Sequence, residues 1–182
     1  MKDTYRGAII YFTPAQITLA KEYSFGLREN IGNKTIPLSE DRDLVGALGE
    51  IAVEERLVAL KVDYIAYSPY VPRQKGDFGD GKIQGDTYDV KSKHIKDEKY
   101  LTNLMGDCTV LAGDQDDVVR KGIVNYIFVN VSLENDPKAF VVGAISTADF
   151  WREARLNEKL KMPGYFVKGI ETKPFTNFVY HS

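Results

Sequence analysis

Residues 87–93 read Thr-Tyr-Asp-Val-Lys-Ser-Lys and alternate strictly between two kinds of side chain. Successive side chains of a β-strand point to opposite faces, so this pattern predicts a strand. Asp89, Lys91 and Lys93 would share one face, with Asp89 and Lys91 about 6–7 Å apart along it. Val90 would point the other way, into the core.

The flanking sequence predicts helices before this strand and both strands and a helix after it. Thr13-Pro14 is typical of an N-cap followed by proline at the first helical position. The patterns predict helices over 14–29, from Ser39 to about Lys61 and from Ser146 to about Leu160, strands over 64–67, 123–133 and 139–145, and short aromatic strands in the tail.

This order of elements predicts an α/β fold with a central mixed β-sheet flanked by helices. It lacks the regular βαβ alternation of a doubly wound fold. We expect one domain over residues 1–182. It would comprise an N-terminal helical extension (1–38), a core (39–160) and a C-terminal tail (161–182) that packs on the core.

Composition restricts the metal chemistry that the chain can support. One cysteine excludes an intramolecular disulfide, and two distant histidines do not make a metal site. Any catalytic metal would therefore be bound by carboxylates, which favours Mg²⁺ or Mn²⁺. No signal peptide or membrane-spanning stretch is present, so the sequence predicts a cytoplasmic protein without membrane contact. The net charge of −2 argues mildly against a simple electrostatic nucleic-acid binder.

The strand over 87–93 contains one of five acid-x-Lys triplets in the chain. Only Asp89-Val90-Lys91 lies in an alternating strand with an acid suitably upstream. We assign Asp80-Gly81-Lys82 to a turn. Asp77 precedes Asp89 by twelve residues, and Glu50 lies on the long helix before both.

This constellation resembles the PD-(D/E)xK signature of restriction-endonuclease-like nucleases, with Gly76 where the family often has proline. The resemblance covers residues 40–160 and implies a restriction-endonuclease-like core. It also implies Mg²⁺-dependent hydrolysis of DNA that leaves 5′-phosphate and 3′-hydroxyl ends. Many such nucleases act as dimers, which makes a homodimer an expectation for this chain.

The chemistry of such a site gives each candidate residue a role. If the intervening segment folds back as a hairpin, Asp77 comes alongside Asp89. A divalent cation then cancels their repulsion, with the Val90 carbonyl and Glu50 as further ligands. The cation polarises the phosphodiester and lowers the pKa of a bound water, and Lys91 orients that water or stabilises the growing charge. We expect Lys93 and Lys75 to contact DNA phosphates.

Each of these residues also has a plainer interpretation. Asp89 and Lys91 could form the solvated face of an edge strand, Asp77 could be only a turn residue, and Glu50 could lie on a solvated helix face. Asp80 or Asp86 could replace Asp77 as the ligand. At the level of function, the alternative is a catalytically inactive nuclease-like fold that binds DNA or protein.

Overall fold

The computed structural model describes residues 7–31, 40–70, 79–157 and 164–180. Its helices are α1 (Pro14–Ile31), α2 (Glu40–Leu60), α3 (Asp114–Lys121), α4 (Thr147–Glu153) and α5 (Phe175–Tyr180), with 3-10 turns η1 (Glu98–Tyr100) and η2 (Gly169–Glu171). Its strands are β1 (Ile9–Tyr11), β2 (Tyr64–Ala66), β3 (Gly81–Ile83), β4 (Asp86–His94), β5 (Asp107–Leu111), β6 (Asn125–Ser132), β7 (Lys138–Ser146), β8 (Arg155–Asn157) and β9 (Gly164–Lys168).

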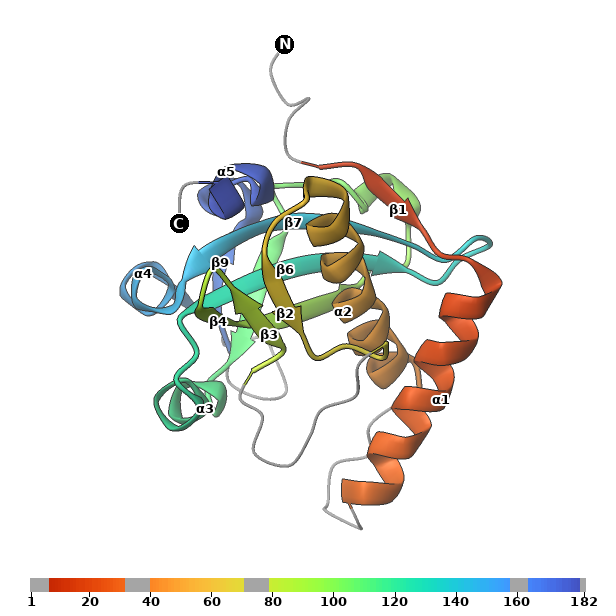
Figure 1. Cartoon of the computed structure of the whole chain (residues 1–182). Helices are drawn as coiled ribbons and strands as arrows, with labels where there is room; N and C mark the ends of the chain where they lie inside the picture. Colours follow the sequence, from red (N-terminus) through yellow and green to blue (C-terminus); the bar gives the residue numbers. More distant parts are fainter. Residues whose placement is uncertain (1–6, 32–39, 71–78, 158–163, 181–182) are drawn as a thin grey trace.

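Six of these strands form a mixed sheet in the order β1-β7-β6-β4-β3-β2. Its centre is the parallel pair β4 and β6, which are aligned from Tyr88 opposite Asn125 to His94 opposite Val131. The other neighbours in this sheet are antiparallel. Helix α2 lies across one face of the sheet (Figure 1). A mixed α/β fold with a central mixed sheet flanked by helices is therefore confirmed.

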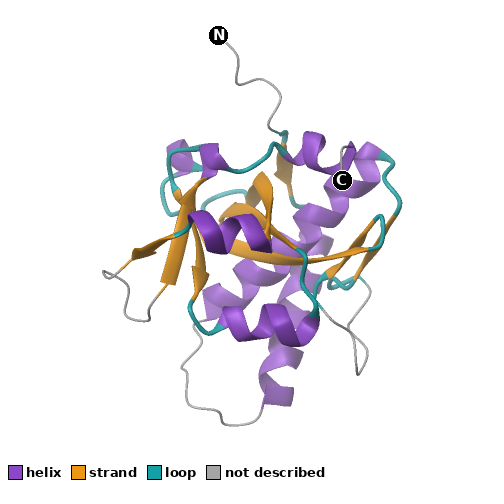
Figure 2. Ribbon diagram, turned by 90° about the vertical axis from the view of Figure 1, so that its left-hand side faces the viewer, coloured by secondary structure: helices purple, strands orange, loops and turns teal. Residues whose placement is uncertain are grey.

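A smaller antiparallel sheet, in the order β5-β9-β8, packs on the face of the large sheet away from α2. Its strands lie on the left of the view in Figure 2. Two apolar clusters result, one on each face of the large sheet. The cluster on the α2 face includes Leu48, Ile51, Tyr88, Ile127, Val129 and Phe175, and the other includes Cys108, Val110, Tyr126, Phe128, Phe150 and Val167.

The side chains of β4 divide between these two faces as the alternation predicts. Tyr88 and Val90 pack with the α2 cluster. Asp89 stands beside Tyr126, and Lys91 beside Phe128, both of which belong to the opposite cluster. The predicted strand, with Val90 turned away from Asp89 and Lys91, is therefore confirmed.

The helix predicted from Ser146 to about Leu160 is shorter than expected. Ser146 is the N-cap, as predicted, and its hydroxyl accepts from the backbone N–H of Asp149 at 3.0 Å. The helix ends at Glu153, because the chain becomes extended at Ala154 and pairs with β9. Strand pairing in the smaller sheet thus outweighs the local helical pattern.

The prediction of aromatic strands in the tail is only partly correct. Residues 164–168 form β9, but residues 175–180 form α5. Phe175, Phe178 and Val179 recur at helical spacing, and all three are buried against the α2 cluster. The aromatic content suggested strands, whereas the spacing was that of a helix.

The Asp80-Gly81-Lys82 triplet is not confined to a turn, because β3 begins at Gly81. The segment 94–121, for which the sequence predicts no helix or strand, contains η1, β5 and α3. Within residues 7–31, 40–70, 79–157 and 164–180, no helix is both long and apolar enough to span a lipid bilayer.

Helix α2 approaches β4 most closely at Gly49. A Cβ atom added there would lie 1.8 Å from Ser92 Oγ and 3.0 Å from Ser92 Cβ. Only a residue without a side chain fits between the helix and the strand at this point. The contact fixes α2, and with it Glu50, on the Tyr88–Val90–Ser92 face of β4.

We expect Gly49→Ala to lower the free energy of unfolding by about 1–3 kcal/mol, since overpacking forces the helix away from the strand. Gly46→Ala in the same helix is the matched control, because a Cβ there meets nothing within 4 Å. Alanine is about 1 kcal/mol better than glycine inside a helix, so the control should not be destabilised. Urea denaturation measures both; equal stability of the two variants would contradict the close contact.

Candidate functional site

The β3–β4 hairpin positions the acidic residues of the candidate site. Its turn residues Gln84 and Gly85 have φ values of 53° and 96°, the positive signs that a two-residue type I′ turn requires. The resulting register pairs Gly81 with Tyr88. One further step along the same register places Asp80 across from Asp89.

Asp80 is held firmly in this position, with only 3% of its surface exposed. Its carboxylate Oδ2 accepts a hydrogen bond from the backbone N–H of Val90 at 2.6 Å. Its own N–H donates to the Tyr88 carbonyl, and its carbonyl accepts from the N–H of Tyr67, both at 2.8 Å. The Asp80 carboxylate is therefore fixed beside the Asp89-Val90-Lys91 triplet.

The ammonium group of Lys91 lies between two carboxylates. Its Nζ is 2.7 Å from Asp89 Oδ2 and 2.9 Å from Asp114 Oδ2. The three side chains are between 17% and 29% exposed, so water screens their attraction only in part. They do not form the fully solvated face of an edge strand. The group as a whole keeps one net negative charge.

Burial and the neighbouring carboxylates shift the pKa of Lys91 in opposite directions. Desolvation on its own lowers the pKa of a lysine, but the carboxylates of Asp89 and Asp114 outweigh it and raise the pKa of Lys91 above its ordinary value. Lys91 is therefore a cation throughout the physiological pH range. It can stabilise negative charge or donate a proton, but it does not act as a general base.

A cavity of about 420 Å³ opens beside this group. It is lined by Arg42, Gly46, Val90, Lys91, Ser92, Thr109, Leu111 and Asp114. We call it the site cavity. Among the described residues, strand β3 pairs with β4 only as far as Tyr88, and the next part of β4, from Val90 to Ser92, lines the cavity. The cavity is large enough for a small ligand or part of a larger one.

Glu50 lies on the other face of β4 from Asp89 and Lys91. It follows Gly49, which contacts Ser92, and its charge raises the pKa of Tyr88 after the larger effects of burial and of Glu54. Its Oε2 is buried, so it is not an ordinary residue of a solvated helix face. Two other residues of α2, Arg42 and Gly46, line the same cavity as Lys91 and Asp114.

The remaining predicted residues fall in different places. Asp77 and Lys75 lie outside the described residues. Asp86 is exposed at the beginning of β4, paired with Ile83, about 10 Å along the strand from Asp89. Lys93 shares the face of Asp89 and Lys91, is exposed, and has its Nζ 3.4 Å from the Asp107 carbonyl. Of the two alternatives to Asp77, Asp80 is the one beside Asp89.

Two residues of the site were not predicted. Asp114 begins α3, directly after β5, and Arg42 lies in the first turn of α2. Alternation of buried Cys108 and Val110 with their neighbours could have indicated β5, and hence an acid at its end. No local pattern connects Asp114 with Lys91, because only the folding of β5 against β4 brings them together.

The oxygen ligands available here suit a hard cation. Within the ranges that the structure describes, no three His, Cys, Asp or Glu side chains converge on one point. Mg²⁺ usually needs only one or two carboxylates, because it keeps several of its waters. Asp80, Asp89 and the Val90 carbonyl are therefore a suitable set of donors.

Comparison of the chain with models of protein families, with curated proteins and with solved structures found no match. The residues of the site must therefore be interpreted from their own chemistry.

Tyr126 forms the floor under Lys91, whose Nζ is 5.8 Å from the centre of its ring. Burial raises the pKa of Tyr126 from 10.0 to about 12. The neutral hydroxyl is favoured in the folded state, so its contribution to stability is complete below pH 10 and is lost as the pH rises towards 12.

We expect the free energy of unfolding to fall between pH 10 and 12 by up to about 1.4 kcal/mol per pH unit from Tyr126. In Tyr126→Phe this part of the slope should disappear. Chemical denaturation at several alkaline pH values, with tyrosinate absorbance recorded in parallel, measures the effect. Identical slopes in the two proteins would contradict it.

Proposed function

We propose that this chain is a metal-dependent deoxyribonuclease that hydrolyses phosphodiester bonds at the site cavity. The observation that carries the proposal is the juxtaposition of Asp80, Asp89 and Lys91 at the open edge of β4. Two carboxylates provide for a divalent cation, and a permanently charged lysine lies beside them.

The order of elements supports the proposal. The family resemblance leads us to expect a helix, three strands, a helix and a further strand. In the described residues α2, β2, β3, β4, α3 and β6 follow one another in that order, with η1 and β5 inserted before α3. The acid-x-Lys triplet lies on the third strand of this series, in a hairpin with the second.

Asp80 takes the role first expected of Asp77 in this proposal. Asp80, Asp89 and the Val90 carbonyl would hold Mg²⁺ or Mn²⁺. The cation, when bound, would polarise the phosphodiester and lower the pKa of a water molecule. Glu50, on α2, would be an accessory acid that completes the ligand set or holds a second cation.

Lys91 and Arg42 would act on the phosphate. In the hydrolysis, an oxygen of water bonds to phosphorus and the bond from phosphorus to the 3′ oxygen breaks. The water gives up a proton and the 3′ oxygen gains one. Lys91, kept charged by Asp89 and Asp114, stabilises the negative charge that accumulates on the phosphate oxygens. Arg42, on the rim of the cavity, binds a neighbouring phosphate.

One observation favours a second candidate, a nuclease-like fold that binds DNA without cleaving it. Both carboxylates around Lys91 are already engaged with its ammonium group. Such a group could serve stability alone, by joining β4 to the start of α3. The experiments below separate this candidate from the enzyme.

We expect the wild-type protein to nick supercoiled plasmid in Mg²⁺ or Mn²⁺. Asp80→Asn, Asp89→Asn and Lys91→Gln should each lower the rate about 100-fold or more, because each removes a charge that acts on the transition state. Agarose-gel assays measure the rate, and circular dichroism checks that each variant is folded.

The matched controls come from two other acid-x-Lys triplets of the chain. These controls are Asp136→Asn and Lys173→Met. Asp136 lies in the β6–β7 turn and Lys173 lies after η2, and neither residue lines the site cavity. These variants should nick at the wild-type rate. If the wild-type protein at high concentration nicks no DNA in either metal, the proposed enzyme activity is wrong. The second candidate, a nuclease-like fold that binds DNA without cleaving it, then remains.

Metal binding has a separate readout that does not depend on cleavage. We expect Mg²⁺ to raise the Tm of the wild-type protein, because a ligand that binds only the folded state stabilises it by mass action. The increase should be lost in Asp80→Asn and in Asp89→Asn and kept in Asp136→Asn. Sodium chloride at equal ionic strength controls for screening, and an equal shift in all four proteins would exclude a site at Asp80 and Asp89.

A further inference from the structure

The site cavity is one end of a longer depression along β4. A second cavity, of about 330 Å³, shares Lys91, Ser92 and Thr109 with it. A third, also about 330 Å³, shares Lys93, His94, Asp107, Cys108 and Asn130 with the second. Because neighbouring cavities share lining residues, they follow one another along β4, and we treat them together as one groove. We call it the β4 groove and its far end the distal pocket.

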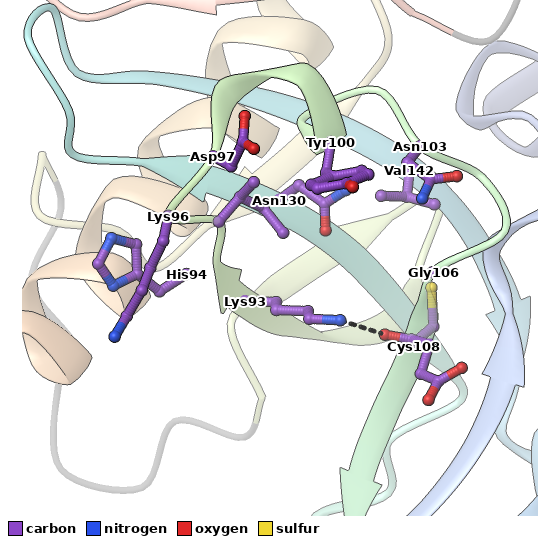
Figure 3. A pocket seen from close by; sticks show the side chains of 12 residues that line it. Lys93, His94, Lys96, Asp97, Tyr100, Asn103, Gly106, Cys108, Asn130 and Val142 are labelled. Atoms are coloured by element: carbon purple, nitrogen blue, oxygen red, sulfur yellow. Dashed lines mark hydrogen bonds between the residues drawn. The ribbon is translucent and has the colours of Figure 1, made fainter.

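The groove runs between β4 and the smaller sheet and is narrow. Lys93 extends from β4 across it to the Asp107 carbonyl of β5, as Figure 3 shows. A single lysine side chain thus spans both walls, so the groove is too narrow for a duplex, and an entering strand would displace the contact between Lys93 and the Asp107 carbonyl.

The charges along the groove leave Lys93 available for a phosphate. Asp107, on the opposite wall, forms an ion pair with Lys168. Lys93 itself forms no ion pair within the described part of the chain, and its contact with the Asp107 carbonyl, at 3.4 Å, is long. An ammonium group in a groove without an ionic partner is suited to bind a phosphate.

The distal pocket combines an aromatic ring and an amide with both apolar and charged side chains, the charged ones being Lys93, Lys96, Asp97 and Asp107. Tyr100 is 50% exposed, and its ring lies next to the amide of Asn130 in Figure 3. Asn130 is only 8% exposed, and its Nδ2 donates to the Leu101 carbonyl at 2.8 Å. Cys108 and Val142 are among the apolar residues of the lining. His94 and Lys96 extend away from this centre (Figure 3).

We infer that the β4 groove binds an unpaired strand of DNA, with a phosphate at Lys93 and an unstacked base in the distal pocket. The base would stack on Tyr100 and form hydrogen bonds with the Asn130 amide. This inference rests on the proposed function and deepens it, because it names single-stranded DNA, or a single-stranded region of it, as the substrate.

The spacing along β4 agrees with this arrangement. Lys93 lies four residues beyond Asp89 on the same face, which is about 13 Å along the strand. The distal pocket would therefore hold a nucleotide other than the one whose phosphate is cleaved. A duplex would have to separate locally before its strand could enter.

Binding can be tested without cleavage, by fluorescence anisotropy of a labelled oligo(dT) with wild-type protein in EDTA. We expect the single strand to bind more tightly than the same sequence paired with oligo(dA). Tyr100→Ala should weaken binding about 5- to 150-fold, the effect of losing one stacked base. Lys93→Gln should reduce the slope of log K against log salt by about 0.7, as expected for one phosphate contact to a single strand.

Matched controls are available on the outer surface. Tyr11 is 64% exposed on β1 and lies under Lys138 as Tyr100 lies under Lys99. Tyr11→Ala and, on α1, Lys21→Gln should bind oligo(dT) like the wild type. A labelled oligo(U) tests whether RNA enters the groove equally well; tighter binding of RNA than of DNA would overturn the assignment to DNA.

The outcome is separable from that of the nicking assay. If the wild type binds oligo(dT) in this pattern but never nicks DNA, the groove stands and the proposed hydrolysis fails. If it nicks DNA while Tyr100→Ala and Lys93→Gln bind like the wild type, the hydrolysis stands and the groove assignment is wrong. Stronger binding of the duplex than of the single strand would also overturn the groove.

Discussion

The parallel pairing of β4 with β6 is the constraint on which the rest of the molecule depends. It extends from Tyr88 to His94 and buries β4 between a helical layer and a smaller sheet. Since strand side chains alternate, this one pairing places Tyr88, Val90 and Ser92 on the face that α2 covers. It assigns Asp89, Lys91 and Lys93 to the β4 groove.

Burying part of a charged side chain costs desolvation free energy, and carboxylates from the surrounding elements offset that cost. Lys91 is desolvated by its position, so it requires carboxylates nearby. Asp89 comes from its own strand and Asp114 from the start of α3. The two acids exceed the lysine by one charge, and Asp80 adds a further carboxylate beside Val90. An excess of partly buried negative charge next to a cavity is what a divalent cation would neutralise.

Much of this arrangement was predictable, because it follows from local patterns. The alternation over 87–93 gave the strand and its two faces, and the capping residues gave the starts of α1 and α4. The helix after Ser146 was predicted too long, and α5 was predicted as a strand, because pairing and packing with distant segments decided both. Asp80 was set in a turn because three-residue β3 is too short to show a period.

Composition and local sequence pattern establish which chemistry is available to this chain. Its scarcity of histidine and cysteine restricts any metal site to oxygen ligands, and one acid-x-Lys triplet occupies a strand with the right alternation. Which residues meet as partners follows from contacts between distant segments of the folded chain. The hairpin register placed Asp80 across from Asp89, and the fold of β5 brought Asp114 to Lys91. These contacts join residues far apart in the chain, and side-chain periodicity, which is a local property, carries no information about them.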